Sequence, residues 1–522
     1  MRKVVLVLLI LVFSVPFFGQ TQDDNLIKYW NYRDRLRKRF IVVSQNVMDY
    51  GVNIPASDIF YGINKGYISW GDGNNNMSHY LSMLSTELWL LKHNNQDYSQ
   101  TLRELLYAMM ALERLDTYSE SNIRWKSIHG FWEHDLNGKN YVQAGDINGF
   151  SLRNDVTDDF WKKYGSHFDV LTFQSNFSSD NTSHFMEENS QDVIEHTMEG
   201  LGLVSKLVGT ESVVNIPCDW SDINVVPRLI QQKIVKDDSI KSQHPTTIDF
   251  SLWAKDIVKR YIRYMQYDGT YNVGVNLPIF GNTTLFSTHW ILINPVTQKC
   301  VQEGSGNMST YLGVSMISSG IIKAGEAIAG ENLRLYPGLF TNCEFKIAFK
   351  RPEIFMLGKE DNLVRSLACT GNLLGNKTFS VLRRLRDNYN PYKKERTLIN
   401  EHLPLMYLTL HSLDAVKLDV AVYNSEKALY EQLLNIAPFS GPASNCGIHS
   451  WSSTSRCLWP NNLGKNTDTH TDYNGLDYMM LHNLYCITFC QTGFKTLDLN
   501  SDTVLPVRNQ TQSSYFIKSS YW

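Results

Sequence analysis

The hydrophobic positions of this chain recur at helical spacing wherever they form a regular pattern. Between Tyr67 and Asp116, two apolar stripes with steps of three and four residues flank a polar link, Lys92–Ser99. Such stripes lie along one face of a helix. Two helices joined by a short polar link predict an αα-hairpin. The stripes consist of Met77, Tyr80, Leu81, Leu84, Leu88 and Leu91, and of Leu102, Leu105, Leu106, Met109, Leu112 and Leu115.

The same spacing predicts helices along most of the chain, about ten to twelve in all. They are expected at Asp23 to about Gly51, Asn189–Gly209, Val226–Lys236, Asp249–Tyr267, Leu312–Ala329, Glu360–Ala368, Asn376–Asn388, Leu398–Leu413, Ser425–Ala437 and Asn474–Cys490. Almost no segment alternates apolar and polar residues as a strand does. Long loops rich in polar and aromatic residues are expected at Thr117–Phe185, Gly269–Gly306 and Pro438–Tyr473.

Paired helices without a fixed sequence period disfavour a solenoid of identical repeats. We therefore expect an all-α fold, a complete or incomplete (α/α) toroid of helical hairpins with long loops at one mouth.

The N-terminus has the layout of a secretory signal peptide. A charged start, Met1-Arg2-Lys3, precedes the apolar run Val4–Phe18, and polar sequence follows. We expect a signal peptide over residues 1–20, a toroid domain over 21–495 and an irregular tail over 496–522. No later segment is long and apolar enough to predict a membrane span. The mature protein is expected to be exported, periplasmic or extracellular.

The net charge and the cysteine content narrow the possible classes of protein. A net charge of -3 argues against a nucleic-acid-binding protein. The short basic runs Arg33–Arg39 and Arg383–Arg386 are interpreted as solvated helix faces. The eight cysteines are sparse; Cys446 and Cys457 form the most plausible pair, whereas Cys486 and Cys490 are expected to be buried as small apolar residues.

No metal site and no cofactor are predicted. The sequence contains neither CxxC nor HExxH, the spacings of common zinc sites. Asp135–Gly138 and Asp146–Gly149 begin like calcium loops but lack the closing glutamate.

The loops before the predicted helices suggest a sugar-binding surface. If helices alternate between an inner and an outer ring, these loops meet at one mouth. Aromatic rings stack on sugar faces, and amide, carboxylate and guanidinium groups bind hydroxyls. The substrate-binding candidates are Trp70, Asn75, Asn76, Arg153, Asp155, Gln191, His289, Trp290, Trp451, Arg456 and Tyr478.

Carboxylates at the predicted helix starts are the catalytic candidates. Asp72 and Asp192 are the leading pair for the acid and base of glycoside hydrolysis, with Asp477 as a third and Glu303 as a runner-up. Helix capping alone also favours aspartate at such positions.

Histidines offer a second catalytic hypothesis. His79 or His289 is a candidate base for a lyase that removes a proton beside a uronate carboxylate, which Arg153 or Arg456 would hold. Packing in the core is the alternative interpretation of either histidine.

Four segments carry a resemblance to a known group of proteins: WGDGNNNMSHYLSMLSTELWLL, LYAMMALERLD, NSQDVIEHTMEGLGLV and NGLDYMMLHNLY. They resemble the (α/α)-toroid superfamily of exported bacterial carbohydrate-active proteins, over about half of the chain at the level of pattern. They also look like exported bacterial proteins without an assigned activity. No catalytic signature of one family is present, so no residue role is transferred.

The resemblance implies an exported glycoside hydrolase or polysaccharide lyase acting on a poly- or oligosaccharide. The alternative is a non-catalytic glycan-binding or surface-interaction protein on the same scaffold.

Overall fold

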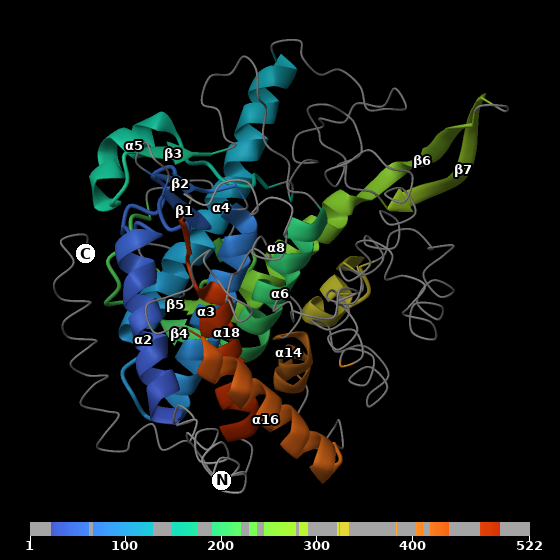
Figure 1. Cartoon of the computed structure of the whole chain (residues 1–522). Coiled ribbons are helices and arrows are strands. Elements are labelled where there is room, and N and C mark those ends of the chain that lie inside the picture. The colour runs from blue at the N-terminus through green and yellow to red at the C-terminus, as the bar shows by residue number, and fades with distance from the viewer. Residues whose placement is uncertain are drawn as a thin grey trace, which may run out of the picture.

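The computed structural model describes residues 22–61, 66–71, 73–128, 149, 151–175, 191–220, 229–236, 245–277, 281–290, 321–322, 324–333, 383, 402–410, 418–437 and 470–490. Helices dominate these ranges, which confirms a mainly helical protein (Figure 1). The helices are α2 (Gln22–Arg39), α3 (Gly73–His93), α4 (Ser99–Ile128), α5 (Asp158–Tyr164), α6 (Gln191–Leu207), α8 (Phe250–Met265), α14 (His402–Leu410), α16 (Val420–Ile436) and α18 (Leu476–Tyr485), which continues as the π-helical turn η4 (Cys486–Cys490).

Three small sheets accompany the helices within the described ranges. The largest has the strand order β3 (Thr172–Gln174), β2 (Tyr67–Ser69), β1 (Asp58–Tyr61) and β8 (His470–Tyr473). Within it, β1 pairs antiparallel with β2 and β8, and β2 pairs parallel with β3. The two others are antiparallel pairs, β4 (Thr210–Ser212) with β5 (Thr247–Asp249) and β6 (Gln266–Leu277) with β7 (Gly281–Trp290). Because β2 leads into α3 and β8 leads into α18, the first sheet lies at the N-terminal ends of these two helices.

Helices α3, α6 and α18 run in the same direction. Near their N-terminal ends, Asn474, just before α18, donates a hydrogen bond to Asn76 of α3, and the ring of His196 of α6 contacts that of His79 of α3. Further along, Asn483 of α18 bonds Thr86 of α3, and past the end of α6 Glu211 pairs with Lys92. Helix α2 is antiparallel to α18, and α4 is antiparallel to α3, as the order of their contacts shows. The starts of α3, α6 and α18 therefore lie at one end of the molecule.

The predicted hairpin at Tyr67–Asp116 is confirmed as α3 and α4, but α4 is longer than expected. It continues to Ile128, so the prediction of an irregular segment from Thr117 is wrong for its first twelve residues. The sequence of residues 117–128 contains neither glycine nor proline. A helix can therefore continue there although the apolar stripe fades.

Two further expectations were wrong because strand signals were missed. Gly269–Gly306 was expected to be a loop, but much of its first half lies in the hairpin of β6 and β7 (Figure 1). Tyr271, Val273, Val275 and Leu277 alternate along β6, which is the period of a strand. The helix expected at Val226–Lys236 does not continue to its end, since Val235 forms an antiparallel bridge with Ile248.

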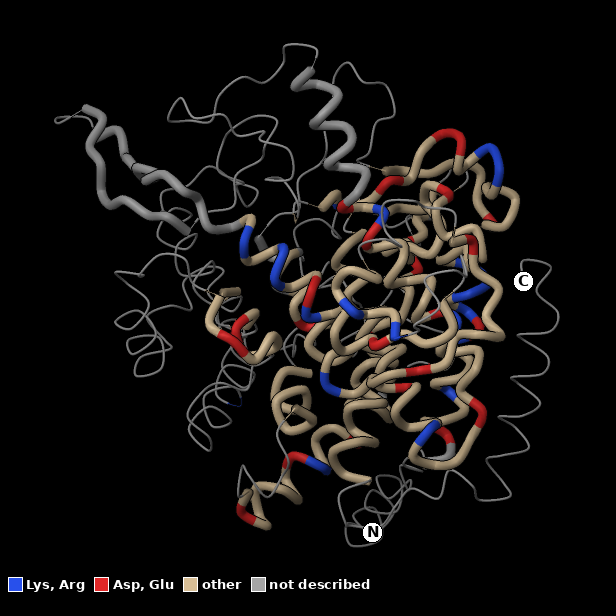
Figure 2. Tube along the Cα trace, turned by 180° about the vertical axis from the view of Figure 1, so that it is seen from behind, with Lys and Arg blue, Asp and Glu red and all other residues tan. Residues whose placement is uncertain are grey.

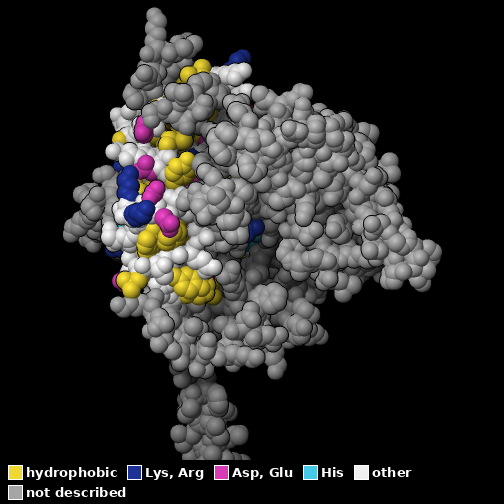
Figure 3. Space-filling view, turned by 90° about the horizontal axis from the view of Figure 1, so that it is seen from above, with side chains coloured by type: hydrophobic (Ala, Val, Ile, Leu, Met, Phe, Trp, Pro, Cys, Tyr) yellow, Lys and Arg dark blue, Asp and Glu magenta, His cyan; other side chains and the backbone are white. Residues whose placement is uncertain are grey.

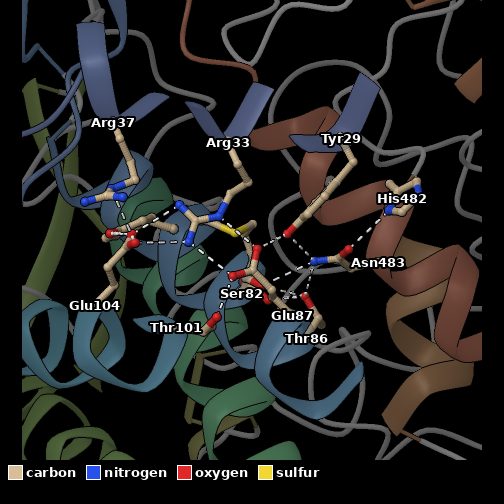
Figure 4. A network of polar contacts seen from close by, with 12 residues as sticks. Tyr29, Arg33, Arg37, Ser82, Thr86, Glu87, Thr101, Glu104, His482 and Asn483 are labelled. Carbon is tan, nitrogen blue, oxygen red and sulfur yellow. Dashed lines mark hydrogen bonds and ion pairs between the residues drawn. The ribbon is translucent and has the colours of Figure 1, made fainter. Parts of the chain in front are cut away.

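Arg33 and Arg35 of the basic run of α2 are buried, whereas Lys38 is exposed, so the interpretation of Arg33–Arg39 as a solvated face is wrong for the first part of the run. Arg33 donates through Nε to Glu87 of α3 at 2.8 Å and through Nη1 to Glu104 of α4 at 3.1 Å (Figure 4). Tyr29 also donates to Glu87 and Tyr80 to Glu104. Two carboxylates inside the helical body thus draw the guanidinium in, because buried charges need partners.

The same network extends to α18. Asn483 donates to Tyr29 Oη at 3.0 Å and to Thr86 Oγ1 at 3.2 Å (Figure 4). His482 stacks on the Tyr29 ring with ring centres 4.8 Å apart. Polar contacts therefore fix α2, α3, α4 and α18 relative to one another.

The apolar interior of the described residues forms one connected cluster that joins all the larger helices. Cys486 and Cys490 are buried in it, as predicted, and neither belongs to a disulfide. Lysines and arginines are interspersed with acidic residues along the described trace (Figure 2), and exposed hydrophobic side chains lie between charged ones on the face seen in Figure 3. None of the helices searched, which belong to the described residues, has the length and apolar character of a membrane span.

Candidate metal centre

Four buried ionisable side chains, from α3, α6 and α14, lie close together inside the protein. His79 comes from the second turn of α3, His196 and Glu199 from the second and third turns of α6, and His402 is the first residue of α14. Glu199 is 0% exposed, His79 and His196 are each 6% exposed, and His402 is 5% exposed. Helices far apart in the sequence thus bring one carboxyl group and three imidazoles together inside the protein.

The distances separate a central group of three from a fourth neighbour. One potential ligand atom from each of His79, His196 and Glu199 lies within 4.8 Å of the other two. Glu199 Oε2 is 3.5 Å from His196 Nδ1 and 3.3 Å from His402 Nε2. The His79 ring centre is 5.1 Å from that of His196 but 6.1 Å from that of His402. His402 therefore contacts the carboxylate from outside the group.

Two features of α6 place its pair of residues against His79. His196 and Glu199 are three residues apart, so they lie on the same face of the helix. Gly200 follows them, and a Cβ at this position would lie 2.7 Å from the carbonyl oxygen of Ser78. A glycine here lets the α6 backbone approach α3 closely, which brings the two faces into contact.

The surroundings of Glu199 favour its ionised form. Burial alone would raise its pKa, but hydrogen bonds from His196 and His402, together with the charges of those rings, outweigh burial and hold the pKa of Glu199 well below its usual range. A buried carboxylate requires positive charge or hydrogen bonds nearby. Its other oxygen, Oε1, has no hydrogen-bond partner among the described residues.

The group has the composition of a transition-metal site. Two imidazoles and one carboxylate are the protein ligands of several catalytic zinc sites and of non-haem iron(II) sites. In a tetrahedral zinc site the ligand atoms are about 3.4 Å apart, as follows from metal–nitrogen distances of about 2.1 Å. The atoms of His79, His196 and Glu199 would need to approach by no more than about 1.4 Å, which side-chain rotation can supply. His402 would hold Glu199 Oε2, as outer partners commonly do for metal-binding carboxylates.

The four catalytic candidates from the sequence have different positions. His79 belongs to the buried group. Asp477 is half-buried in the first turn of α18, where its charge, second to burial, raises the pKa of Tyr32. Asp192 is the second residue of α6, one turn before His196. Asp72 lies outside the described residues.

Several substrate-binding candidates have structural roles instead. Trp70 is fully buried and donates from Nε1 to the Ile54 carbonyl, and Tyr478 is buried with its hydroxyl on the Asn25 carbonyl. Neither aromatic ring offers a face to a ligand, so we do not retain them as stacking surfaces.

The polar candidates beside them also bind the protein itself. Asp155 forms an ion pair with Arg114 at 2.6 Å, and Asn76 Oδ1 accepts from Asn474 at 2.7 Å. Arg153 is half-buried, and its carbonyl oxygen lies against Gly73 at the start of α3.

The remaining candidates are not brought together with this group by any described contact. Asn75 lies on α3 one turn before His79, and Gln191 is the first residue of α6. His289 and Trp290 end β7. Trp451 and Arg456 lie outside the described residues.

His196, Glu199 and His402 were not predicted from the sequence as one site. A local signal existed, because HTME over residues 196–199 places two ligand types on one helix face. This spacing differs from HExxH, in which the two histidines are four residues apart. His79 and His402 join the pair only through tertiary packing.

Comparisons of this chain with protein-family models, with curated proteins and with solved structures gave no match. The metal-site interpretation therefore depends on the geometry of the chain itself.

Proposed function

We propose that this protein binds a divalent first-row transition-metal ion between α3 and α6, with His79, His196 and Glu199 as ligands. The observation that carries the proposal is the meeting of their ligand atoms within 4.8 Å, inside the protein. A bound ion would also balance the charge of Glu199, which no arginine or lysine contacts among the hydrogen bonds and ion pairs of the described residues.

Metal analysis of the purified protein tests this directly. After incubation with zinc or iron(II) and dialysis, we expect about one ion per chain. Glu199→Gln keeps the shape of the side chain but removes its charge, and we expect it to weaken binding by more than the roughly 10–100-fold effect of an outer partner. His482→Asn is the control, because His482 is also buried but lies on α18. Wild-type protein without bound metal, or equal loss in His482→Asn, would contradict the proposal.

A second candidate function is the exported carbohydrate-active enzyme inferred from the sequence. This function is favoured because α3, α6 and α18 all begin at the same end of the molecule. Asp192 and Asp477 occupy the first turns of α6 and α18, and Asp72 directly precedes α3 in sequence. We propose that these helices belong to the inner ring of an (α/α) toroid, with α2 and α4 outside.

A polysaccharide panel tests this second function. Depolymerisation by the wild type that is lost in Asp192→Asn or Asp72→Asn would support it. Unsaturated uronate absorbance in the product would indicate a lyase, whereas new reducing ends without it would indicate a hydrolase. Unchanged glycan binding without product would favour the non-catalytic alternative.

A further inference from the structure

Among the described residues, no fourth side chain joins the three proposed ligands, so a coordination position is left for another ligand. Tetrahedral catalytic zinc sites have three protein ligands and a fourth, exchangeable one, and iron(II) sites with two histidines and a carboxylate keep further positions open. His402 does not fill this position, because its Nε2 is directed at Glu199 Oε2 at 3.3 Å.

The face of α3 that carries His79 also carries polar side chains before and after it, at Asn75 and Ser82. Asn75 precedes His79 by four residues and Ser82 follows it by three, so all three lie on one side of the helix. Asn75 Oδ1 and Ser82 Oγ are buried atoms without a hydrogen-bond partner in the described part of the chain. Buried polar atoms in folded proteins are nearly always paired, so this row points to water or a ligand bound along it.

The exposure along this row indicates the direction of access. Asn75 is partly exposed near the start of α3, His79 is almost buried, and Ser82 is fully buried. The row therefore opens toward the N-terminal ends of the parallel helices α3 and α6. The free N–H groups and dipoles at those ends favour an anion over a cation.

We propose that the ion at His79, His196 and Glu199 keeps one coordination position for an exchangeable oxygen or anionic ligand, water or a small anion, that enters past Asn75. This inference rests on the metal site proposed above. It makes the site one that can activate a bound water rather than a purely structural one, because zinc lowers the pKa of bound water to about 7 when a position stays open.

Cobalt(II)-loaded full-length protein with azide as the probe tests the open position. Azide that binds the ion changes the visible spectrum of cobalt in a saturable way, and we expect this change in the wild type. A cobalt spectrum that saturating azide leaves unchanged would overturn this inference while leaving the metal site intact. Absence of cobalt binding would overturn both.

Asn75→Leu tests the route. We expect cobalt to remain bound and the apparent dissociation constant of azide to rise about tenfold or more, because an apolar side chain replaces a polar one on the path. Asn94→Leu, at the opposite end of α3, is the matched control and should leave azide binding unchanged. Equal azide binding in wild type and Asn75→Leu would overturn the route past Asn75, as would loss of cobalt itself in that variant.

Discussion

At the scale of single residues, the contact between His402 and Glu199 should affect metal binding without being required for it. His402→Ala removes the donor to Glu199 Oε2, so we expect metal affinity to fall about 10–100-fold. His402→Gln keeps an N–H donor and should recover part of the loss. Titration with a competing chelator measures both, and affinity unchanged in His402→Ala would show that His402 does not position the carboxylate.

His482 should make stability fall in mildly acidic solution. Burial, first of all, lowers its pKa from 6.5 to about 4, and the charge of Lys28 adds to this. Between these values the unfolded chain takes up a proton that the folded protein does not. Stability therefore decreases as the pH falls from about 6.5 toward 4, by about 3 kcal/mol for this residue.

Chemical denaturation between pH 7.5 and 4.5 measures this slope. His482→Asn should make it shallower, since asparagine does not titrate, while His167, whose pKa burial also lowers, contributes equally in both proteins. Glu199 does not contribute in this window, because its lowered pKa affects stability only below its ordinary value of 4.5. An identical slope in wild type and His482→Asn would contradict the role of His482.

At the scale of helices, Arg33 holds α2 against α3 and α4. Arg33→Met leaves Glu87 and Glu104 inside the protein without their guanidinium, and we expect a loss of about 3–5 kcal/mol in the free energy of unfolding. Lys38→Met on the same helix is the control: its exposed pair with Asp34 contributes less than about 1 kcal/mol. Comparable losses in the two variants, measured by urea denaturation, would refute the assignment.

Gly200 sets the distance between α6 and α3, and hence the metal site. Gly200→Ala places a Cβ against the Ser78 carbonyl, so we expect weaker metal binding and a destabilisation of about 1–3 kcal/mol. Gly209→Ala is the matched control, because nothing lies within 4 Å of a Cβ there. Metal affinity retained in Gly200→Ala would argue against a site that depends on this close approach.

Helix periodicity predicted most of the described helices but not all of their ends, since the helix expected from Asp23 to about Gly51 ends at Arg39, and it did not predict their partners. The stripes from Met77 to Leu91 and from Leu102 to Leu115 identified α3 and α4, because burial of one face follows a period of 3.6 residues. The alternation of apolar and polar residues in β6 did not predict a strand, because glycines and polar residues surround its few apolar positions. The burial of Arg33 was missed for another reason, since its partners are Glu87 and Glu104, 54 and 71 residues away.

The candidate site was predicted only at His79. The composition of the loop containing Trp70 predicted a site, yet Trp70 donates to the Ile54 carbonyl and Asn76 accepts from Asn474, so both contact the protein itself. The ligands of the metal group are separated by 120 residues of sequence between His79 and Glu199. Their meeting depends on the packing of α6 on α3, which no local pattern reports.

At the scale of the whole molecule, α3 is the helix around which the described parts are arranged. One of its faces joins the buried ion network of α2, α4 and α18, and another joins α6 at the proposed metal site. Its N-terminal end lies with those of α6 and α18. This arrangement places the proposed ion one to two turns from the end where the sequence predicted a substrate mouth.

X-ray absorption spectroscopy of the zinc-loaded protein tests the central claim, a metal ion held by His79, His196 and Glu199, most directly. We predict a first shell of only nitrogen and oxygen at about 2.0–2.1 Å, with the outer-shell scattering of two imidazoles, and loss of this signal in Glu199→Gln. A sulfur shell at about 2.3 Å would place the ion at a cysteine instead, such as Cys486 beside His482, and would contradict the claim.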